Sequence, residues 1–305
     1  MSAQTSPVAG AFRTAVVPAA GLGTRFLPTT KAVPKELLPV VDTPGIELVA
    51  AEAAEAGAQR LLVVASPGKE SVAGYFRNDD ELEQTLEDRG KHALLAKVRR
   101  APGLLAVDSV YQHDPRGLGH AVAQAGPALA DDEQAVAVLL PDDLVLGPDG
   151  TDAGVLGRMA QVHAELGGSV LCAFDVPRDQ VPAYGVFEVS DTADEDVKQV
   201  HGMVEKPAPE DAPSTLAAAG RYLLDRAIFD ALERITPGAG GELQLTDAVA
   251  LLISEGHPVH VVVHRGDRHD LGNPGGFARA FVDFALRDPE YGEGLRRWLT
   301  DRLKD

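Results

Sequence analysis

A glycine-containing loop followed by closely spaced cations lies near the amino end of the sequence. Gly21 and Gly23 come directly after a short apolar run, and Arg25, Lys31 and Lys35 follow them. Backbone N–H groups of such a loop can hold phosphate oxygens, arginine offers phosphate a planar pair of donors, and lysine supplies a compact charge. Prolines among these cations fix φ and stiffen the segment. This pattern predicts a rigid cationic site for a polyphosphate.

The charge of the chain is distributed unevenly. Residues 1–35 carry four cations and no acid, whereas the whole chain has 28 Lys and Arg against 46 Asp and Glu, a net charge of −18. This net charge argues against a nucleic-acid polymer or an anionic membrane as the main partner. The basic segment predicts a focused pocket for a small anion, although charge alone is equally consistent with a cationic N-terminal arm.

Two adjacent carboxylates follow a second apolar run. Asp142 and Asp143 come after the strand expected at residues 135–140, at the carboxyl end of a parallel strand, where open α/β sheets bind ligands. Mg²⁺ prefers few carboxylates together with phosphate and water oxygens. This position makes the carboxylate pair a candidate for binding a metal ion or a ligand, and we interpret Asp143 as an ordinary turn residue.

The glycine loop does not match the dinucleotide-binding fingerprint. Phe26 stands in place of its third glycine, and the following Leu27-Pro28 cannot open a regular helix. The Walker phosphate-binding sequence is also absent. These departures argue against a nicotinamide cofactor and leave a phosphate-binding loop of another kind.

The segment at residues 18–44, PAAGLGTRFLPTTKAVPKELLPVVDTP, is similar to the signature of the sugar nucleotidyltransferases. Further motifs of that family follow in order at residues 112–122, 139–143, 183–185, 204–207, 220–222, 240–247 and 269–272. Within the family, the motifs look most like those of the bacterial enzymes that join UTP and glucose 1-phosphate. The ordered series spans nearly the whole chain, which a chance match would not do.

This resemblance implies roles for particular residues. It places the nucleotide against Ala20, Gly21, Gly23, Gln112, Gly117 and Asp142, and the sugar against Gly185, Glu205, Gly220 and Glu242. It assigns catalytic charge to Arg25, Lys35 and Lys206, and a metal ion to Asp142 and Asp270. Independently, the Gln112 amide can both donate and accept, as a pyrimidine edge requires, whereas Glu205 and Lys206 alone would be interpreted as a surface ion pair.

The implied reaction is Mg²⁺-assisted, in-line attack of glucose 1-phosphate on the α-phosphorus of UTP, giving UDP-glucose and pyrophosphate. Two alternatives stay open. One is the same chemistry with dTTP or another hexose 1-phosphate, and the other is a non-catalytic paralogue that binds a nucleotide sugar and regulates a partner. We expect no acid–base role for His120, because a histidine at a helix start more often forms structural hydrogen bonds.

Alternating strands and helices must position these residues. Strands are expected at 13–18, 60–65, 105–112, 135–140, 169–175, 184–189, 197–204, 221–224 and 259–264, and helices at 46–56, 153–166, 224–233, 244–255, 274–286 and 291–304. This order predicts an α/β fold with a Rossmann-like, doubly wound mixed sheet, an antiparallel extension on the sugar side and C-terminal helices. Alternating valines beside His260 predict a half-buried strand with a polar face, not a metal site.

The expected domain spans residues 11–288, with a nucleotide-binding half at about 11–145 and a sugar-binding half at about 146–288. Residues 289–305 are expected to form a helix whose apolar stripe, Leu295, Trp298, Leu299 and Leu303, is a candidate contact in a homodimer or homotetramer. The single cysteine, Cys172, excludes an internal disulfide and is expected in the core. The sequence contains no apolar run long enough to span a membrane, and its first residues lack the pattern of a signal peptide. We therefore expect a cytoplasmic protein with no membrane partner.

Overall fold

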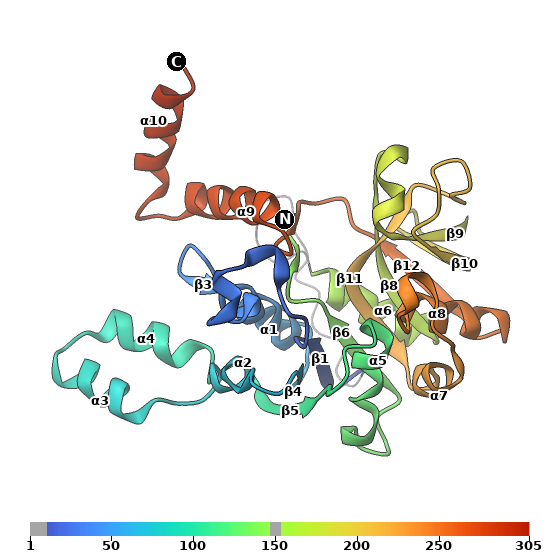
Figure 1. Ribbon diagram of the computed structural model, residues 1–305, viewed down its shortest axis with the longest axis horizontal. Helices are drawn as coiled ribbons and strands as arrows, with labels where there is room; N and C mark the ends of the chain where they lie inside the picture. Colours follow the sequence, from blue (N-terminus) through green and yellow to red (C-terminus); the bar gives the residue numbers. More distant parts are fainter. Residues whose placement is uncertain (1–10, 147–153, 305) are drawn as a thin grey trace.

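The computed structural model describes residues 11–146 and 154–304, which form one nine-stranded sheet with helices packed around it (Figure 1). The strand order is β5-β4-β1-β6-β11-β8-β12-β10-β9. These strands are β1 (Thr14–Pro18), β4 (Arg60–Ala65), β5 (Ala106–Tyr111), β6 (Ala135–Leu139), β8 (Ser169–Asp175), β9 (Gly185–Asp191), β10 (Val197–Glu205), β11 (Leu216–Asp225) and β12 (Val259–Val263). Two short antiparallel pairs lie apart from the sheet: β2 (Pro39–Val40) with β3 (Thr43–Pro44), and β7 (Asp143–Val145) with β13 (Arg268–Asp270).

Ten α-helices and six short 3₁₀ turns join the strands of the described part of the chain. The helices are α1 (Gly45–Glu55), α2 (Glu70–Gly74), α3 (Asp80–Asp88), α4 (His92–Arg100), α5 (Leu118–Ala123), α6 (Val155–Leu166), α7 (Ala227–Arg234), α8 (Leu245–Ser254), α9 (Pro274–Arg287) and α10 (Gly292–Arg302). The 3₁₀ turns are η1 (Thr24–Phe26), η2 (Thr29–Lys31), η3 (Lys35–Leu37), η4 (Gly126–Ala128), η5 (Arg178–Ala183) and η6 (Ala239–Gly241).

The core consists of two large apolar layers, one on each face of the sheet, and a smaller third cluster around Val181 and Val186. Val16 and Val17 are both fully buried, yet they belong to different clusters, because successive side chains of a strand point to opposite faces. The cluster around Val17 receives side chains from α1, α6 and α9, and the cluster around Val16 from α5, α7 and α8. The predicted doubly wound α/β fold is therefore confirmed, and Cys172 lies in the core as expected.

The mixed character of the sheet has two sources. β10 runs antiparallel to β12 and β9 at one edge, which matches the predicted antiparallel extension. β11 also runs antiparallel to both of its neighbours, β6 and β8, but it lies in the middle of the sheet. The sequence pattern located only residues 221–224 of this strand, because its first half consists of small residues with weak strand propensity.

The expectation for β12 was wrong in one respect. This strand lies between β8 and β10, inside the sheet, so it is covered on both faces and His260 is buried rather than part of a polar face. Burial lowers the pKa of His260 and favours the neutral imidazole. Among the described residues, no group of three or more His, Cys, Asp or Glu is arranged to hold a metal ion, so the structure gives no support to a histidine metal site here.

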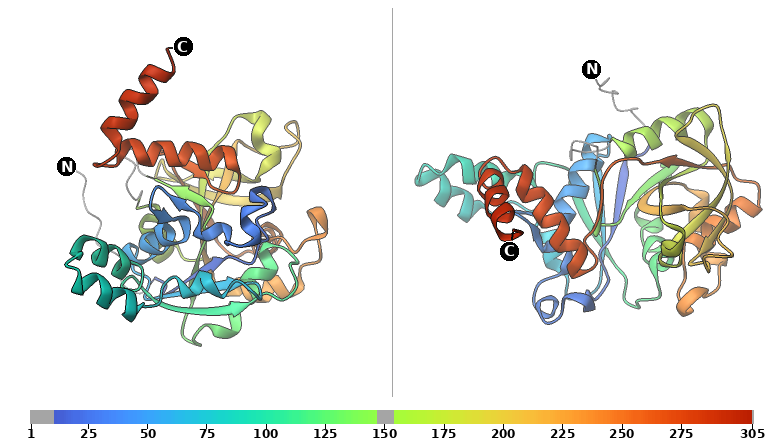
Figure 2. Two further views of the ribbon diagram at one scale, coloured as in Figure 1. Left: turned by 60° about the vertical axis from the view of Figure 1, so that its left-hand side comes forward. Right: turned by 90° about the horizontal axis from the view of Figure 1, so that it is seen from above.

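Two helical segments project from the body. The α3–α4 hairpin, which the sequence analysis did not predict, extends from one end of the sheet, and α10 stands away from α9 at the carboxyl end (Figures 1 and 2). The helix predicted at 153–166 begins at Val155, and Ala153 lies outside the described residues. Over the described ranges, no helix combines the length and the apolar composition needed to cross a membrane.

Candidate active site

The glycine loop and the aspartates leave the same edge of the sheet. β1 and β6 are parallel neighbours, with Ala15 opposite Ala137, so the residues that follow each strand emerge side by side. The loop at residues 19–23 follows β1, and Asp142 comes three residues after β6 ends at Leu139. The expected placement of both features at carboxyl ends of parallel strands is thus observed.

Three consecutive 3₁₀ turns, η1 to η3, carry the cations of the basic segment. Gly23 begins this segment with φ +64°, and a Cβ there would lie 3.1 Å from Thr30 Cγ2. The Thr30 hydroxyl donates to the Gly23 carbonyl at 2.8 Å, which closes the segment back onto the glycine loop. Glycine is favoured here because the left-handed conformation and the close packing both disfavour a side chain. The compact path brings Arg25 and Lys35 to one side.

Arg25, Lys35, Asp142 and Asp270 meet around Gly272. Lys35 Nζ lies 2.5 Å from Asp142 Oδ2, and Arg25 Nη1 donates to the Gly272 carbonyl at 3.3 Å. A Cβ on Gly272 would lie 2.9 Å from Asp270 Oδ1, 3.1 Å from Asp142 Oδ2 and 3.7 Å from Arg25 Nη1. The basic segment and the two distant aspartates therefore share one small region, as a site for a triphosphate would require.

Backbone pairing sets the two aspartates side by side. The amide of Leu271 donates to the Asp142 carbonyl at 2.6 Å, and the β7–β13 pair places Asp270 opposite Asp143. The Asp270 carboxylate is oriented by the amide of Gly272 on Oδ1 and by Asn273 Nδ2 on Oδ2, each at 2.7 Å. Both carboxylates are thus held by local structure before any ligand binds.

Asp143 is the residue whose interpretation the structure corrects. It is buried, begins β7 and pairs with Arg268 at 2.7 Å, and its Oδ2 accepts the amide of Gly220 at 2.6 Å. Arg268 in turn stacks on Phe174 and Tyr184, with its guanidinium carbon 4.2 Å from the Phe174 ring centroid. A turn residue would not be buried in this way, and Asp143 instead joins β7, β11 and β13 beneath the predicted sugar residues.

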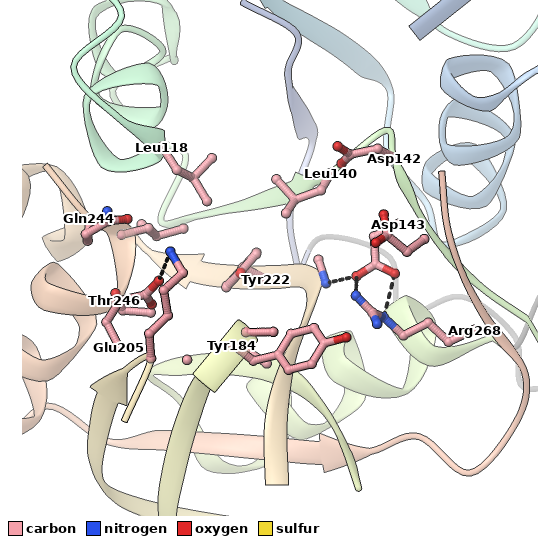
Figure 3. Close-up of a pocket in the computed structure, with 17 residues that line it drawn as sticks. Leu118, Leu140, Asp142, Asp143, Tyr184, Glu205, Tyr222, Gln244, Thr246 and Arg268 are labelled. Atoms are coloured by element: carbon pink, nitrogen blue, oxygen red, sulfur yellow. Dashed lines mark hydrogen bonds and ion pairs between the residues drawn. The ribbon is translucent and has the colours of Figure 1, made fainter. Parts of the chain in front are cut away.

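A cavity of about 230 Å³ opens beside these aspartates (Figure 3). Its lining includes six of the predicted site residues: Asp142, Gly185, Glu205, Lys206, Gly220 and Asp270. It also includes residues that the sequence analysis did not select, namely Asp143, Tyr184, Tyr222, Gln244, Thr246 and Arg268. Asp142, which follows β6, lies on one side of the cavity, and Glu205, at the end of β10, lies on the other (Figure 3).

Lys206 and Glu205 reach this cavity through an unusual backbone conformation. Lys206 has φ +49°, in the left-handed region that side chains rarely adopt, and its amide donates to the Tyr184 carbonyl at 2.9 Å. The two side chains form an ion pair at 3.0 Å, which Figure 3 shows at the edge of the cavity. Because such backbone strain persists mainly where the surroundings hold it, it favours a binding role over a simple surface ion pair.

The other predicted nucleotide residues form a neighbouring group around the end of β4. The amide of Ala19 donates to the Val64 carbonyl and the amide of Gln112 to the Ala65 carbonyl, both at 2.8 Å. The glycine loop and Gln112 therefore lie on either side of the β4 terminus. Gln112 Nε2 donates to the Gly117 carbonyl at 3.2 Å and lies 2.9 Å from His120 Nδ1.

His120 lies between two glutamine side chains. Its ring nitrogens lie within hydrogen-bonding distance of Gln112 and Gln124, and burial is the main cause that lowers its pKa. Glu242 does not line the cavity, but it lies against Gly117, where a Cβ would come within 2.8 Å of the Glu242 Cβ. Because Gln244, which lines the cavity, donates to Glu242 Oε2 at 3.3 Å, Glu242 lies between the two groups of predicted residues.

Comparison with known proteins identifies the family. A family model described as nucleotidyl transferase matches residues 14–286, most of the chain. The chain belongs to the nucleotidyl transferase family. A curated member from Streptococcus pneumoniae serotype 4, named UTP–glucose-1-phosphate uridylyltransferase, is 41% identical over 293 residues, which cover 96% of this chain and 97% of that protein.

Solved structures of nucleotidyl transferases give the same result. A UTP-bound UGPase from Acinetobacter baumannii matches with a TM-score of 0.85 and 37% identity, covering 95% of this chain and 99% of that one. A UDP-glucose pyrophosphorylase complexed with UDP-glucose matches with a TM-score of 0.79 and 33% identity, covering 91% of this chain and all of the other. The resemblance predicted from the sequence motifs is thereby confirmed.

Proposed function

We propose that this chain transfers the uridylyl group of UTP to glucose 1-phosphate and releases UDP-glucose and pyrophosphate. The observation that carries the proposal is the convergence of Arg25, Lys35, Asp142 and Asp270 around Gly272, next to a polar cavity of about 230 Å³. The relatives match nearly the full length of the chain, and their names support the same substrates.

The proposed reaction needs positioning and charge neutralisation more than acid–base chemistry. A phosphate oxygen of glucose 1-phosphate attacks the α-phosphorus of UTP, the bond from that phosphorus to the oxygen bridging to the β-phosphate breaks, and pyrophosphate leaves with the electron pair. The nucleophile is already an anion, so repulsion between the two phosphorylated reactants is the main obstacle. Arg25 and Lys35 reduce it on the nucleotide side, and Lys206 on the sugar side.

The two substrates fit different parts of the site. Ala20, Gly21, Gly23, Gln112 and Gly117 hold the nucleotide at the ends of β1, β4 and β5. The sugar phosphate occupies the cavity, where Gly185 and Gly220 allow backbone contacts, Glu205 accepts from sugar hydroxyls, and Glu242 supports the wall. Asp142 belongs both to the residues assigned to the nucleotide and to the lining of the sugar cavity, so the reacting phosphates meet beside it.

Nucleotidyl transferases of this family generally use a divalent metal ion, and the aspartates here suit Mg²⁺. Asp142 Oδ2 and Asp270 Oδ1 face the same point beside Gly272, and no third acid, histidine or cysteine of the described chain joins them in a cluster. Two carboxylates with phosphate and water oxygens form the ligand set that Mg²⁺ favours. When bound, the ion would stabilise negative charge on the phosphate oxygens.

A nucleotide panel tests this function. Pyrophosphate release is measured with Mg²⁺ and glucose 1-phosphate, using UTP, dTTP, CTP, ATP and GTP in turn, and then with UTP and other hexose 1-phosphates. We expect the highest kcat/KM with UTP and glucose 1-phosphate. A preference for dTTP or another sugar would establish the related chemistry instead, and normal ligand binding without turnover would identify a regulatory, non-catalytic protein.

We further propose that the chain assembles with a second copy through α10. Leu295 and Leu299 are half-buried, whereas Trp298 is 61% exposed and Leu303 is 82% exposed. Large apolar side chains exposed together on one projecting helix mark an interaction surface. α10 stands clear of the sheet in Figure 1 and in the left view of Figure 2, so a second copy can approach it.

Light scattering of the purified protein tests the assembly. The parental chain is expected to have the mass of a dimer or tetramer, and Trp298→Glu is expected to lower that mass because it places a charge in the apolar contact. Arg297→Glu, at the neighbouring exposed position, is the matched control. An unchanged mass for Trp298→Glu would show that α10 is not the contact.

A further inference from the structure

Lys69 lies beside the glycine loop and belongs to no motif used above. Its Nζ donates to the carbonyl of Ala19 at 2.9 Å and to the carbonyl of Gly21 at 2.6 Å. It also lies 3.0 Å and 3.2 Å from the two carboxylate oxygens of Glu36. One side chain therefore joins the loop after β1 to the 3₁₀ turn η3.

The Lys69–Glu36 pair is set into the interior. The Glu36 side chain is 0% exposed and the Lys69 side chain 13% exposed. Burial is the largest influence on the Glu36 carboxyl and raises its pKa, while the Lys69 charge is the main influence that lowers it. A buried carboxylate of this kind requires a charged, hydrogen-bonded partner, and Lys69 is that partner.

Local structure directs Lys69 toward the loop. β4 runs parallel to β1, and the chain leaves β4 through a turn in which Gly68 has φ +90°. Glu70 Oε1 accepts the Gly68 amide at 3.0 Å, and the Lys69 amide donates to the Ser66 carbonyl at 3.1 Å. This turn places Lys69 directly before α2, and its contact with the Ala19 carbonyl shows that it lies next to the end of β1.

The contacts of Lys69 fix the peptide groups on both sides of the Ala20–Gly21 peptide group. The Ala19 carbonyl belongs to the peptide group before Ala20, and the Gly21 carbonyl belongs to the peptide group after Gly21. The peptide group between Ala20 and Gly21 therefore lies between two anchored neighbours. Glu36 directly follows Lys35, whose ammonium contacts Asp142, so the same pair also supports the cation on the phosphate side.

We propose that Lys69, held by Glu36, is a positioning residue that orders the glycine loop for the nucleotide. This inference rests on the proposed function, since it assumes that the loop binds UTP. An ammonium group has three N–H donors, and the two carbonyls and the carboxylate use all three. Lys69 thus acts through the loop backbone and does not itself bind phosphate. Preorganising the loop lowers the entropy cost of binding the base.

Three variants separate the loop contacts from the buried charge. Lys69→Met removes the donors but leaves Glu36 buried without its partner, so it affects both the loop and stability. The double variant Lys69→Met/Glu36→Gln also lacks the loop donors but contains no buried charge. Glu36→Gln alone keeps Lys69 on the two carbonyls.

Lys69→Met, alone or combined with Glu36→Gln, is expected to raise the KM and the Kd for UTP by about tenfold or more. This is the effect of losing charge-assisted hydrogen bonds from Lys69 to the loop. The KM for glucose 1-phosphate should change less than about twofold, because its cavity lies apart from the loop. Glu36→Gln should stay within about threefold of the parental UTP values. Steady-state kinetics and calorimetric UTP binding supply these numbers.

Lys198→Met is the matched control. Lys198 has a similar exposure, 17%, and pairs with Asp191 at 3.1 Å in β10, away from the loop. Its removal should leave both KM values unchanged. Hydrogen exchange of the peptide covering residues 19–26 gives a readout that needs no substrate, and exchange should be faster in the double variant than in the parental protein or Lys198→Met.

The proposal would be overturned by unchanged UTP values in the double variant, or by equal changes in both KM values with a loss of stability. It would also be overturned if the exchange of residues 19–26 were unaffected. Failure of the proposed function is recognised separately, because the parental protein would then neither bind UTP nor release pyrophosphate from it. In that case the exchange measurement still decides whether Lys69 orders the loop.

Discussion

Replacing Asp142 with asparagine is expected to lower kcat by roughly a thousandfold or more, because a metal ion and its carboxylate ligands supply several kcal/mol of stabilisation to such a transfer. The substitution removes one negative charge facing the point beside Gly272 and the partner of Lys35. Asparagine keeps the size of the side chain, so the hydrogen bond from the Leu271 amide to the backbone carbonyl of residue 142 remains. Pyrophosphate release at saturating UTP and glucose 1-phosphate measures the effect.

The control for this experiment is Asp131→Asn, an exposed aspartate after η4 that lies outside the cavity lining. It should retain parental activity. Circular dichroism should be the same for all three proteins, since the Asp142 side chain is 29% exposed and the amide oxygen of asparagine can still accept a hydrogen bond from Lys35. If Asp142→Asn retained more than about a tenth of the parental kcat, the assignment of Asp142 as a metal ligand would be wrong.

Features encoded by local sequence were predictable. The end of β1 and the loop that follows were located from an apolar run meeting Gly21 and Gly23, and the end of β6 from a similar run before Asp142. Parallel strands place their carboxyl ends at one edge, so the meeting of these two segments followed from the βαβ pattern. The sequence therefore indicated where the site would lie.

Ion pairs between distant segments were not predictable in the same way. Asp143 pairs with Arg268, Glu36 with Lys69 and Glu52 with Arg221, and each partner comes from another element. A buried aspartate and an exposed turn aspartate look identical in one sequence, because burial depends on which strands become neighbours. One signal was available for Lys69: it follows Gly68 just beyond the expected strand at 60–65, the same kind of position as Asp142.

The central antiparallel strand explains a further difference. β11 inserts between β6 and β8 and brings Gly220 and Arg221 to the middle of the sheet. Its small residues give little periodic signal, so antiparallel strands were expected only in an extension on the sugar side of the sheet. Packing decides the position of β11. The strand fills the space between the parallel strands ending in β6 and those beginning with β8, and it brings the amide of Gly220 to the Asp143 carboxylate.

Arg221→Met is expected to destabilise the fold by about 3–5 kcal/mol, the usual cost of leaving one partner of a buried ion pair uncompensated. Arg221 is 0% exposed, and its Nε and Nη2 donate to the Glu52 carboxylate at 2.7–2.9 Å. Its Nη1 also donates to the Gly220 carbonyl at 3.0 Å. The pair joins α1 to β11, so its loss affects the packing of a helix on the centre of the sheet. Urea denaturation followed by circular dichroism measures the change.

A second substitution separates the lost pair from a lost side chain. Arg221→Met/Glu52→Leu removes both charges and fills the space with apolar groups, so it should recover most of the stability that Arg221→Met loses. Arg234→Met, which breaks the exposed pair of Arg234 with Glu255, should leave the denaturation midpoint nearly unchanged because water compensates the remaining charge. If the double variant were as unstable as Arg221→Met, the hydrogen bonds from Arg221 to the backbone beside Gly220, and not its pairing with Glu52, would account for the stability of this region.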